Sequence, residues 1–103
     1  MTISKEERQR ITLYTKNLKN VLQERYRQKF RVHTSQSLRP NPFIEVRVNN
    51  WETEIMPNDL RVIAVKIAYG ENSNVSNWDD VNYGNIRRGG ITLSYSQWSK
   101  IVG

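Results

Sequence analysis

Apolar residues in the first thirty positions recur at spacings of three and four, which is the period of an α-helix. Ser4 comes before this stripe and Glu7 follows three residues later, a capping-box pattern that marks a helix start. We therefore expect a long helix over about residues 5–30, with one face packed on a sheet or a partner helix. The stripe consists of Ile11, Tyr14, Leu18, Val21, Leu22, Tyr26 and Phe30.

Further along the chain the apolar spacing changes to two. Residues 43–49 alternate, which predicts a half-buried strand with its isoleucine and valines on one face. Residues 60–69 are more continuously apolar and predict a second, more central strand. Residues 30–34 fit either a short strand or the frayed end of the helix. Residues 86–93 predict a last strand, broken at a double glycine that permits a bulge or positive φ.

Turn signals separate these segments and complete the fold prediction. Pro40 and Pro42 predict a loop, residues 56–59 a turn, and residues 70–77 a second loop. Residues 78–85 fit either a bent strand or a long loop.

A second capping box, formed by Ser94 and Gln97, predicts a short helix over about residues 95–102. We expect one α+β domain over residues 1–103. Its parts are a long N-terminal helix, a sheet of three to four antiparallel strands over about 43–93, and the short C-terminal helix.

Charge is distributed unevenly between the two parts of the chain. The protein has 103 residues and a formal net charge of +6. Residues 1–39 contain ten Lys or Arg and three Glu, whereas residues 40–103 contain six basic and seven acidic side chains. A basic segment of this kind is typical of a polyanionic partner, and it also fits a solvated helix that keeps the protein in solution.

No apolar run approaches the roughly 18 residues of a membrane span, and the first residues are too polar for a signal peptide. From these features we expect no membrane partner and a cytoplasmic location, with association to the nucleoid as one form of it.

The sequence offers little for catalysis. There is no cysteine, which excludes disulfides, thiol catalysis and cysteine-ligated metals. His33 is the single histidine, and nothing marks a carboxylate partner for it. The acidic pairs Glu52/Glu54 and Asp79/Asp80 are candidates for Mg²⁺, but they lie beside turns, where solvated acids are common. We expect no enzyme, no cofactor and no bound metal.

Binding of nucleic acid is better supported, since it needs cations for phosphates and flat rings for bases. If the sheet presents the polar face of residues 43–49, we expect Arg47 to share a groove with one arginine of the pair at 87–88 and with exposed aromatics. Trp98 lies beside Ile101 and Val102 and is expected in the core. The candidate contact residues are Arg47, Trp51, Arg61, Lys66, Trp78, Arg87 and Arg88. A secondary basic patch on the first helix consists of Arg10, Lys16 and Arg27.

Residues 84–101 resemble the end of the single-stranded-DNA-binding domain of the positive cofactor four family of transcriptional coactivators. Arg87-Arg88-Gly89 stands where that family has a basic pair and a glycine. Gly90-Ile91-Thr92-Leu93 and Gln97-Trp98 follow at nearly the family spacing, with one extra glycine. Residues 62–67 align loosely with the family's preceding strand.

The resemblance implies a curved four-stranded sheet, a homodimer, and grooves that bind unpaired DNA, with Arg87 and Arg88 on phosphates. The chain departs from the family in its short C-terminal helix and its added N-terminal helix.

Together these observations predict a non-enzymatic protein that binds single-stranded DNA or RNA as a transcription, replication or repair cofactor. Its other expected partner is a second copy of itself. The alternative is a protein-interaction adaptor that docks through the apolar stripe of its first helix. Burial of Tyr14, Leu18, Leu22 and Tyr26 within the monomer would weaken that alternative.

Overall fold

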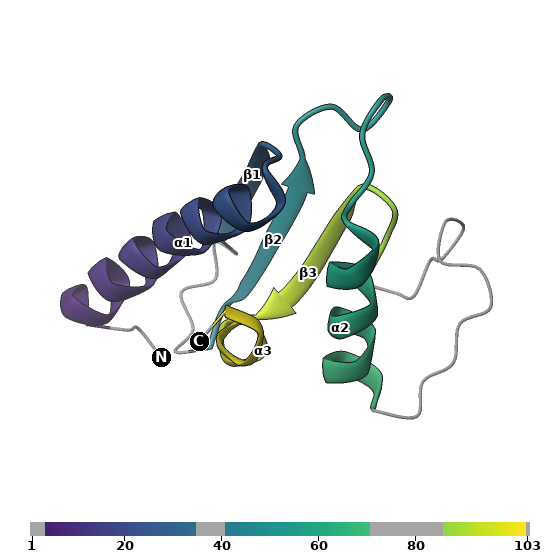
Figure 1. Ribbon diagram of the computed structural model, residues 1–103. Helices are drawn as coiled ribbons and strands as arrows, with labels where there is room; N and C mark the ends of the chain where they lie inside the picture. The colour runs from purple at the N-terminus through teal and green to yellow at the C-terminus, as the bar shows by residue number, and fades with distance from the viewer. Residues whose placement is uncertain (1–3, 35–40, 71–85, 103) are drawn as a thin grey trace.

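The computed structural model describes residues 4–34, 41–70 and 86–102, which form three helices and a three-stranded antiparallel sheet (Figure 1). This arrangement confirms the α+β class with a long N-terminal and a short C-terminal helix. The elements in chain order are α1 (Lys5–Tyr26), β1 (Phe30–Thr34), β2 (Phe43–Val48), α2 (Asn58–Tyr69), β3 (Gly90–Ser94) and α3 (Tyr95–Val102).

Helix α1 begins where the capping pattern predicts. The Ser4 Oγ accepts a hydrogen bond from the Glu7 backbone N–H at 3.1 Å. The helix ends at Tyr26 rather than near residue 30, because Arg27 adopts a left-handed backbone with φ 52°. The chain then re-enters extended backbone, and residues 30–34 form strand β1 instead of a frayed helix end.

The apolar stripe of α1 faces the protein's own sheet. Leu18 and Leu22 are fully buried, and Tyr14 and Tyr26 are partly buried against the same core. This burial within the monomer weakens the alternative function, in which the stripe docks on a partner protein.

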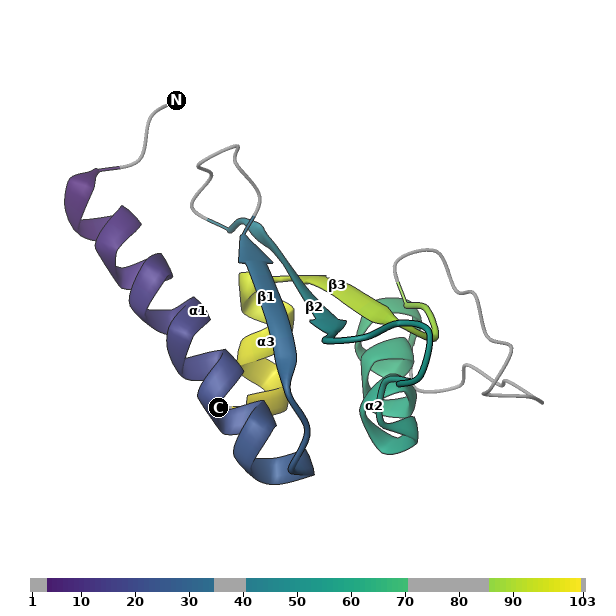
Figure 2. The same ribbon diagram turned by 90° about the horizontal axis from the view of Figure 1, so that it is seen from above.

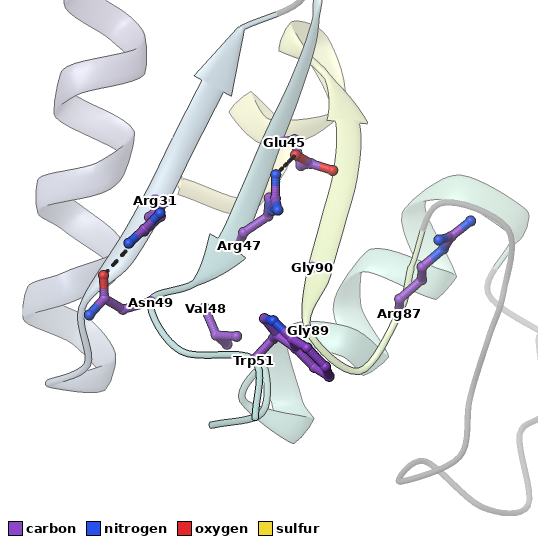
Figure 3. A pocket seen from close by; sticks show the side chains of 9 residues that line it. All are labelled: Arg31, Glu45, Arg47, Val48, Asn49, Trp51, Arg87, Gly89 and Gly90. Carbon is purple, nitrogen blue, oxygen red and sulfur yellow. Dashed lines mark hydrogen bonds and ion pairs between the residues drawn. The ribbon is translucent and has the colours of Figure 1, made fainter. Parts of the chain in front are cut away.

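The sheet has the order β1-β2-β3, with both pairs antiparallel. Alternation along β2 buries Ile44, Val46 and Val48 on one face, as predicted. Helices α1 and α3 lie on that side of the sheet, and α2 lies beyond β3 (Figures 1 and 2). In the described part of the chain, no helix covers the opposite face, which Figure 3 views directly. We call this opposite side the open face.

Residues 60–69 form helix α2, so the predicted second strand is wrong. Leu60, Ala64 and Val65 are buried while Lys66 is exposed, which is a helical rather than an alternating pattern. The turn expected at residues 56–59 is also wrong in part, since Pro57 is the N-cap and Asn58 opens the helix. Gly70 ends α2 with φ 110°, and its N–H donates to the Lys66 carbonyl at 2.9 Å.

Helix α3 closes the core from the far end of the chain. The Ser94 N–H donates to Gln97 Oε1 at 2.9 Å, and the Gln97 N–H donates to Ser94 Oγ at 3.4 Å. This is the predicted capping box. Trp98 is fully buried, and its Nε1–H donates to the Ile44 carbonyl at 2.8 Å. Trp98 is therefore a core residue, as expected, and it ties α3 to the central strand. None of the helices within residues 4–34, 41–70 and 86–102 has the length and hydropathy to span a membrane.

Candidate nucleic-acid interface

The open face contains a cleft of about 550 Å³ at the end of the sheet where β2 finishes and β3 begins (Figure 3). Three arginines, a tryptophan and an asparagine contribute to it, together with one carboxylate. Its lining residues are Arg31, Glu45, Arg47, Val48, Asn49, Trp51, Arg87, Gly89 and Gly90.

Strand pairing sets the first row of the cleft. Arg47 on β2 lies opposite Arg31 on β1 and opposite Gly90 on β3. The Arg31 Nε–H donates to Asn49 Oδ1 at 3.3 Å, which orients its guanidinium along the sheet. Arg47 forms an ion pair with Glu45 at 3.5 Å, and both side chains are about half exposed. Exposed pairs of this kind contribute at most about 1 kcal/mol, so the pair can open toward a stronger anion.

The basic pair at 87–88 sits on a turn that backbone hydrogen bonds fix in place. Ile86 bridges Ile91, and the Arg87 N–H donates to the Gly90 carbonyl at 2.8 Å. The Arg88 carbonyl accepts from the Met56 N–H at 2.7 Å. Arg87 lines the cleft, whereas Arg88 is exposed at the tip and does not line it.

The double glycine acts differently from the prediction. Among the described residues, positive φ occurs at Arg27 and Gly70, and neither Gly89 nor Gly90 adopts it. Strand β3 begins at Gly90, later than the predicted strand from residue 86. Gly90 provides room for the Arg47 side chain rather than an unusual backbone, whereas a Cβ on Gly89 would meet only ordinary contacts.

Trp51 stands at the rim of the cleft with 77% of its surface exposed. Its loop is nevertheless well fixed. The Asn50 carbonyl accepts from the Thr53 and Glu54 N–H groups, and Asn50 Oδ1 accepts from the Glu52 N–H at 3.1 Å. The Asn50 N–H in turn donates to Glu54 Oε1 at 2.8 Å. A large exposed ring on a hydrogen-bonded turn is a preformed stacking surface, because the loop loses little conformational freedom when a base binds.

The segment 60–69 contains two predicted contact residues, Arg61 and Lys66, and neither lines this cleft. Arg61 is fully buried in α2, where its Nη2 donates to Asn58 Oδ1 at 3.3 Å, so its prediction as a nucleic-acid contact is wrong. The cause is the helical fold of this segment, which turns Arg61 inward. Lys66 is exposed on α2 but does not line the cleft. Trp78 lies outside the described residues.

The secondary basic patch is also separate from the cleft. Arg10, Lys16 and Arg27 are exposed on α1 and its C-cap. Helix α1 packs on the side of the sheet opposite the open face, so these cations do not line the cleft (Figures 1 and 2). They contribute to the field around the protein rather than to this site.

Among the polar residues of the cleft, the candidates predicted from the sequence did not include Arg31, Glu45 and Asn49. The signal was present in residues 30–34, where Arg31 and His33 alternate with Phe30 and Val32. If that segment is a strand, Arg31 lies on the same face of the sheet as Arg47 of the next strand. Because residues 30–34 fit a strand and a helix end equally well, the sequence alone does not place Arg31 in the site.

The remaining acids do not form a metal centre in the described ranges. No group of three or more His, Asp or Glu side chains there is placed to hold a metal ion. Glu54 accepts the Asn50 N–H and serves the Trp51 loop. Asp79 and Asp80 lie outside the described residues.

The stretch that resembles the positive cofactor four family corresponds to the turn at 87–89, strand β3 and helix α3. Residues 62–67, which aligned loosely with the family's preceding strand, belong to helix α2. The residues that carry the resemblance therefore lie in the last strand and helix. Comparison with protein-family models, curated proteins and solved structures gives no match to this chain.

Proposed function

We propose that this protein binds single-stranded DNA or RNA across the cleft of its open face, without catalysing a reaction. One observation carries the proposal: the highly exposed Trp51 ring and the arginines Arg31, Arg47 and Arg87 line a single cleft. Stacking on an aromatic ring contributes roughly 1–3 kcal/mol per base. The arginines supply the phosphate contacts that give such binding its affinity and salt dependence.

Single strands fit this cleft better than duplexes. Trp51 can stack on a base only when that base is not already stacked and paired within a helix. The cleft also lies on a sheet surface, with its arginines on three different segments: β1, β2 and the turn before β3. No helix of the described chain projects from this face to enter a major groove (Figures 1 and 2).

The family resemblance supports the same function. The cleft includes Arg87 and Gly89 from the stretch that resembles positive cofactor four. On this basis we propose a role as a cofactor in transcription, replication or repair, with the protein acting as a homodimer. The mass in solution tests the dimer, and a monomer at high concentration would contradict it.

The test of binding is a salt titration of a labelled single strand of about 12 nucleotides, within the range of roughly 4–16 covered by small sheet-based domains. Fluorescence anisotropy measures the affinity at each salt concentration. We expect log affinity to fall linearly with log salt, and Arg31→Ala and Arg47→Ala each to reduce the slope by about 0.7, the value for one phosphate contact on a single strand.

Arg10→Ala is the matched control, because it removes the same charge from helix α1, which lies on the other side of the sheet (Figure 2). It should reduce the slope less than either cleft variant. Absence of binding at low salt would end the proposal, and equal effects of all three variants would move the site away from the open face.

A further inference from the structure

The open face has a second hollow at the opposite end of the strands. It measures about 220 Å³ and is lined by His33, Thr34, Phe43, Glu45 and Thr92. Strand pairing places His33, Glu45 and Thr92 in one row across β1, β2 and β3. Glu45 lines both this hollow and the arginine cleft. The two hollows are therefore neighbours along β2, with Glu45 between them.

Phe43 gives the second hollow an aromatic ring on the same face as Arg47. Residues 43, 45 and 47 alternate with the buried residues of β2, so all three point to the open side. Phe43 and Arg47 are four residue steps apart along β2, which is a distance of about 14 Å. Phe43 is 47% exposed, although a phenylalanine on a strand ordinarily packs against a neighbour. A single strand that stacks on Trp51 and passes Arg47 would continue toward Phe43.

Glu45 determines what the second hollow can hold. An ionised carboxylate only accepts hydrogen bonds, and it repels a phosphate group. The backbone of a bound strand is therefore kept beside Arg31, Arg47 and Arg87, and a base is turned toward Glu45. Carboxylates recognise the exocyclic amino group of cytosine, whereas the O4 carbonyl of uracil or thymine offers them no donor.

We propose that the hollow around Phe43 and Glu45 is a base-reading subsite that prefers cytosine over uracil and thymine. Phe43 stacks on the base, and the Glu45 carboxylate accepts the hydrogen bond of its amino group. In the free protein the Glu45 carboxylate pairs with Arg47 at 3.5 Å, and it becomes available to the base when Arg47 turns to a phosphate. This inference rests on the proposed binding of single strands, and it adds a sequence preference to it.

The test compares labelled deoxycytidine and deoxyuridine homo-oligomers of about 12 nucleotides, which differ only in the pyrimidine ring. Anisotropy is measured at mildly alkaline pH, where cytosine is unprotonated. We expect the wild type to bind the deoxycytidine strand about fivefold more tightly, at the low end of a base contact. In Glu45→Gln the ratio should approach one, while affinity for deoxyuridine rises because a negative charge has been removed.

Phe43→Leu separates stacking from hydrogen bonding, since it should weaken binding of both strands and leave their ratio unchanged. If neither strand binds the wild type at low salt, the proposed function and the subsite both fail. If both bind equally, or if Glu45→Gln keeps the wild-type ratio, the subsite is wrong while single-strand binding stands. Both side chains are partly exposed, so these variants are expected to fold.

Discussion

Gly90 of β3 lies directly opposite Arg47 of β2, and the stem of the arginine crosses over the glycine. A Cβ placed on Gly90 would lie 3.2 Å from Arg47 Cγ and 3.5 Å from the Val46 carbonyl oxygen. The first distance is tighter than an ordinary carbon–carbon contact. The close approach at Gly90 therefore comes from the neighbouring arginine rather than from the glycine's own backbone, and it affects where the Arg47 guanidinium reaches in the cleft.

Gly90→Ala should weaken binding of a single strand by about threefold, or roughly 0.7 kcal/mol. The added methyl group displaces the Arg47 side chain by a few tenths of an ångström, and that side chain is about half exposed and able to move. Stability should change by less than about 1 kcal/mol for the same reason. Anisotropy titration and urea unfolding measure the two effects.

Gly89→Ala is the control for this variant. Its Cβ would meet Trp51 Cβ at 3.7 Å and Val48 Cγ2 at 3.8 Å, which are ordinary contacts. Gly89→Ala should therefore retain affinity. Equal losses of affinity in the two variants would show that the position of the Arg47 side chain does not determine the affinity for single strands.

Trp51→Ala should reduce affinity for single strands about 10- to 100-fold, the loss of one stacked base. Trp51→Phe should recover part of it, because the smaller ring still stacks. Neither variant should shift the urea midpoint, since the indole is 77% exposed and its loop is held by backbone and Asn50 hydrogen bonds. A lowered midpoint in both variants would instead assign Trp51 to folding.

Local patterns predicted those parts of the fold that local forces determine. The two capping boxes, the alternating strand β2 and the burial of Trp98 all follow from spacings within a few residues. Residues 60–69 could not be resolved in this way, because a ten-residue apolar run fits a buried strand and a buried helix alike. In the structure this segment is a helix, and it packs against α3 and β3.

The site was predicted in part for a related reason. Arg47, Trp51 and Arg87 were recognised from charge and aromaticity, and the cleft brings these three together. Arg31 joins them only through the pairing of β1 with β2, a long-range register that no local pattern specifies. Arg61 was misplaced because its orientation follows from the helix, and the helix was not predicted.

Trp98→Phe should destabilise the protein by about 1–3 kcal/mol without altering the composition of the cleft. The substitution removes the Nε1–H that donates to the Ile44 carbonyl at 2.8 Å, and the smaller phenyl ring leaves part of the buried space of the indole unfilled. Urea unfolding measures the loss, and anisotropy under folding conditions should give wild-type affinity. A loss of affinity in the fully folded variant would contradict the assignment of Trp98 to the core alone.

Alkaline pH should destabilise the protein partly through Tyr26. Burial raises the pKa of Tyr26 above its ordinary 10.0, and the nearby Asp59 carboxylate raises it further by its charge and by accepting a hydrogen bond, against a smaller opposing effect of Arg25. The folded state therefore keeps the phenol proton at a pH where the unfolded chain has lost it. The stabilisation is complete below pH 10 and is lost as the pH rises through the folded pKa.

Tyr26→Phe removes this titration, so the stability difference between wild type and variant should shrink between about pH 9 and pH 11. Asp59→Asn should weaken the same pH dependence while keeping the phenol, because it removes the charge that opposes ionisation. Urea unfolding of the three proteins across this range measures the effect. A wild-type advantage over Tyr26→Phe that stays constant up to pH 11 would mean that ionisation of Tyr26 is not linked to folding.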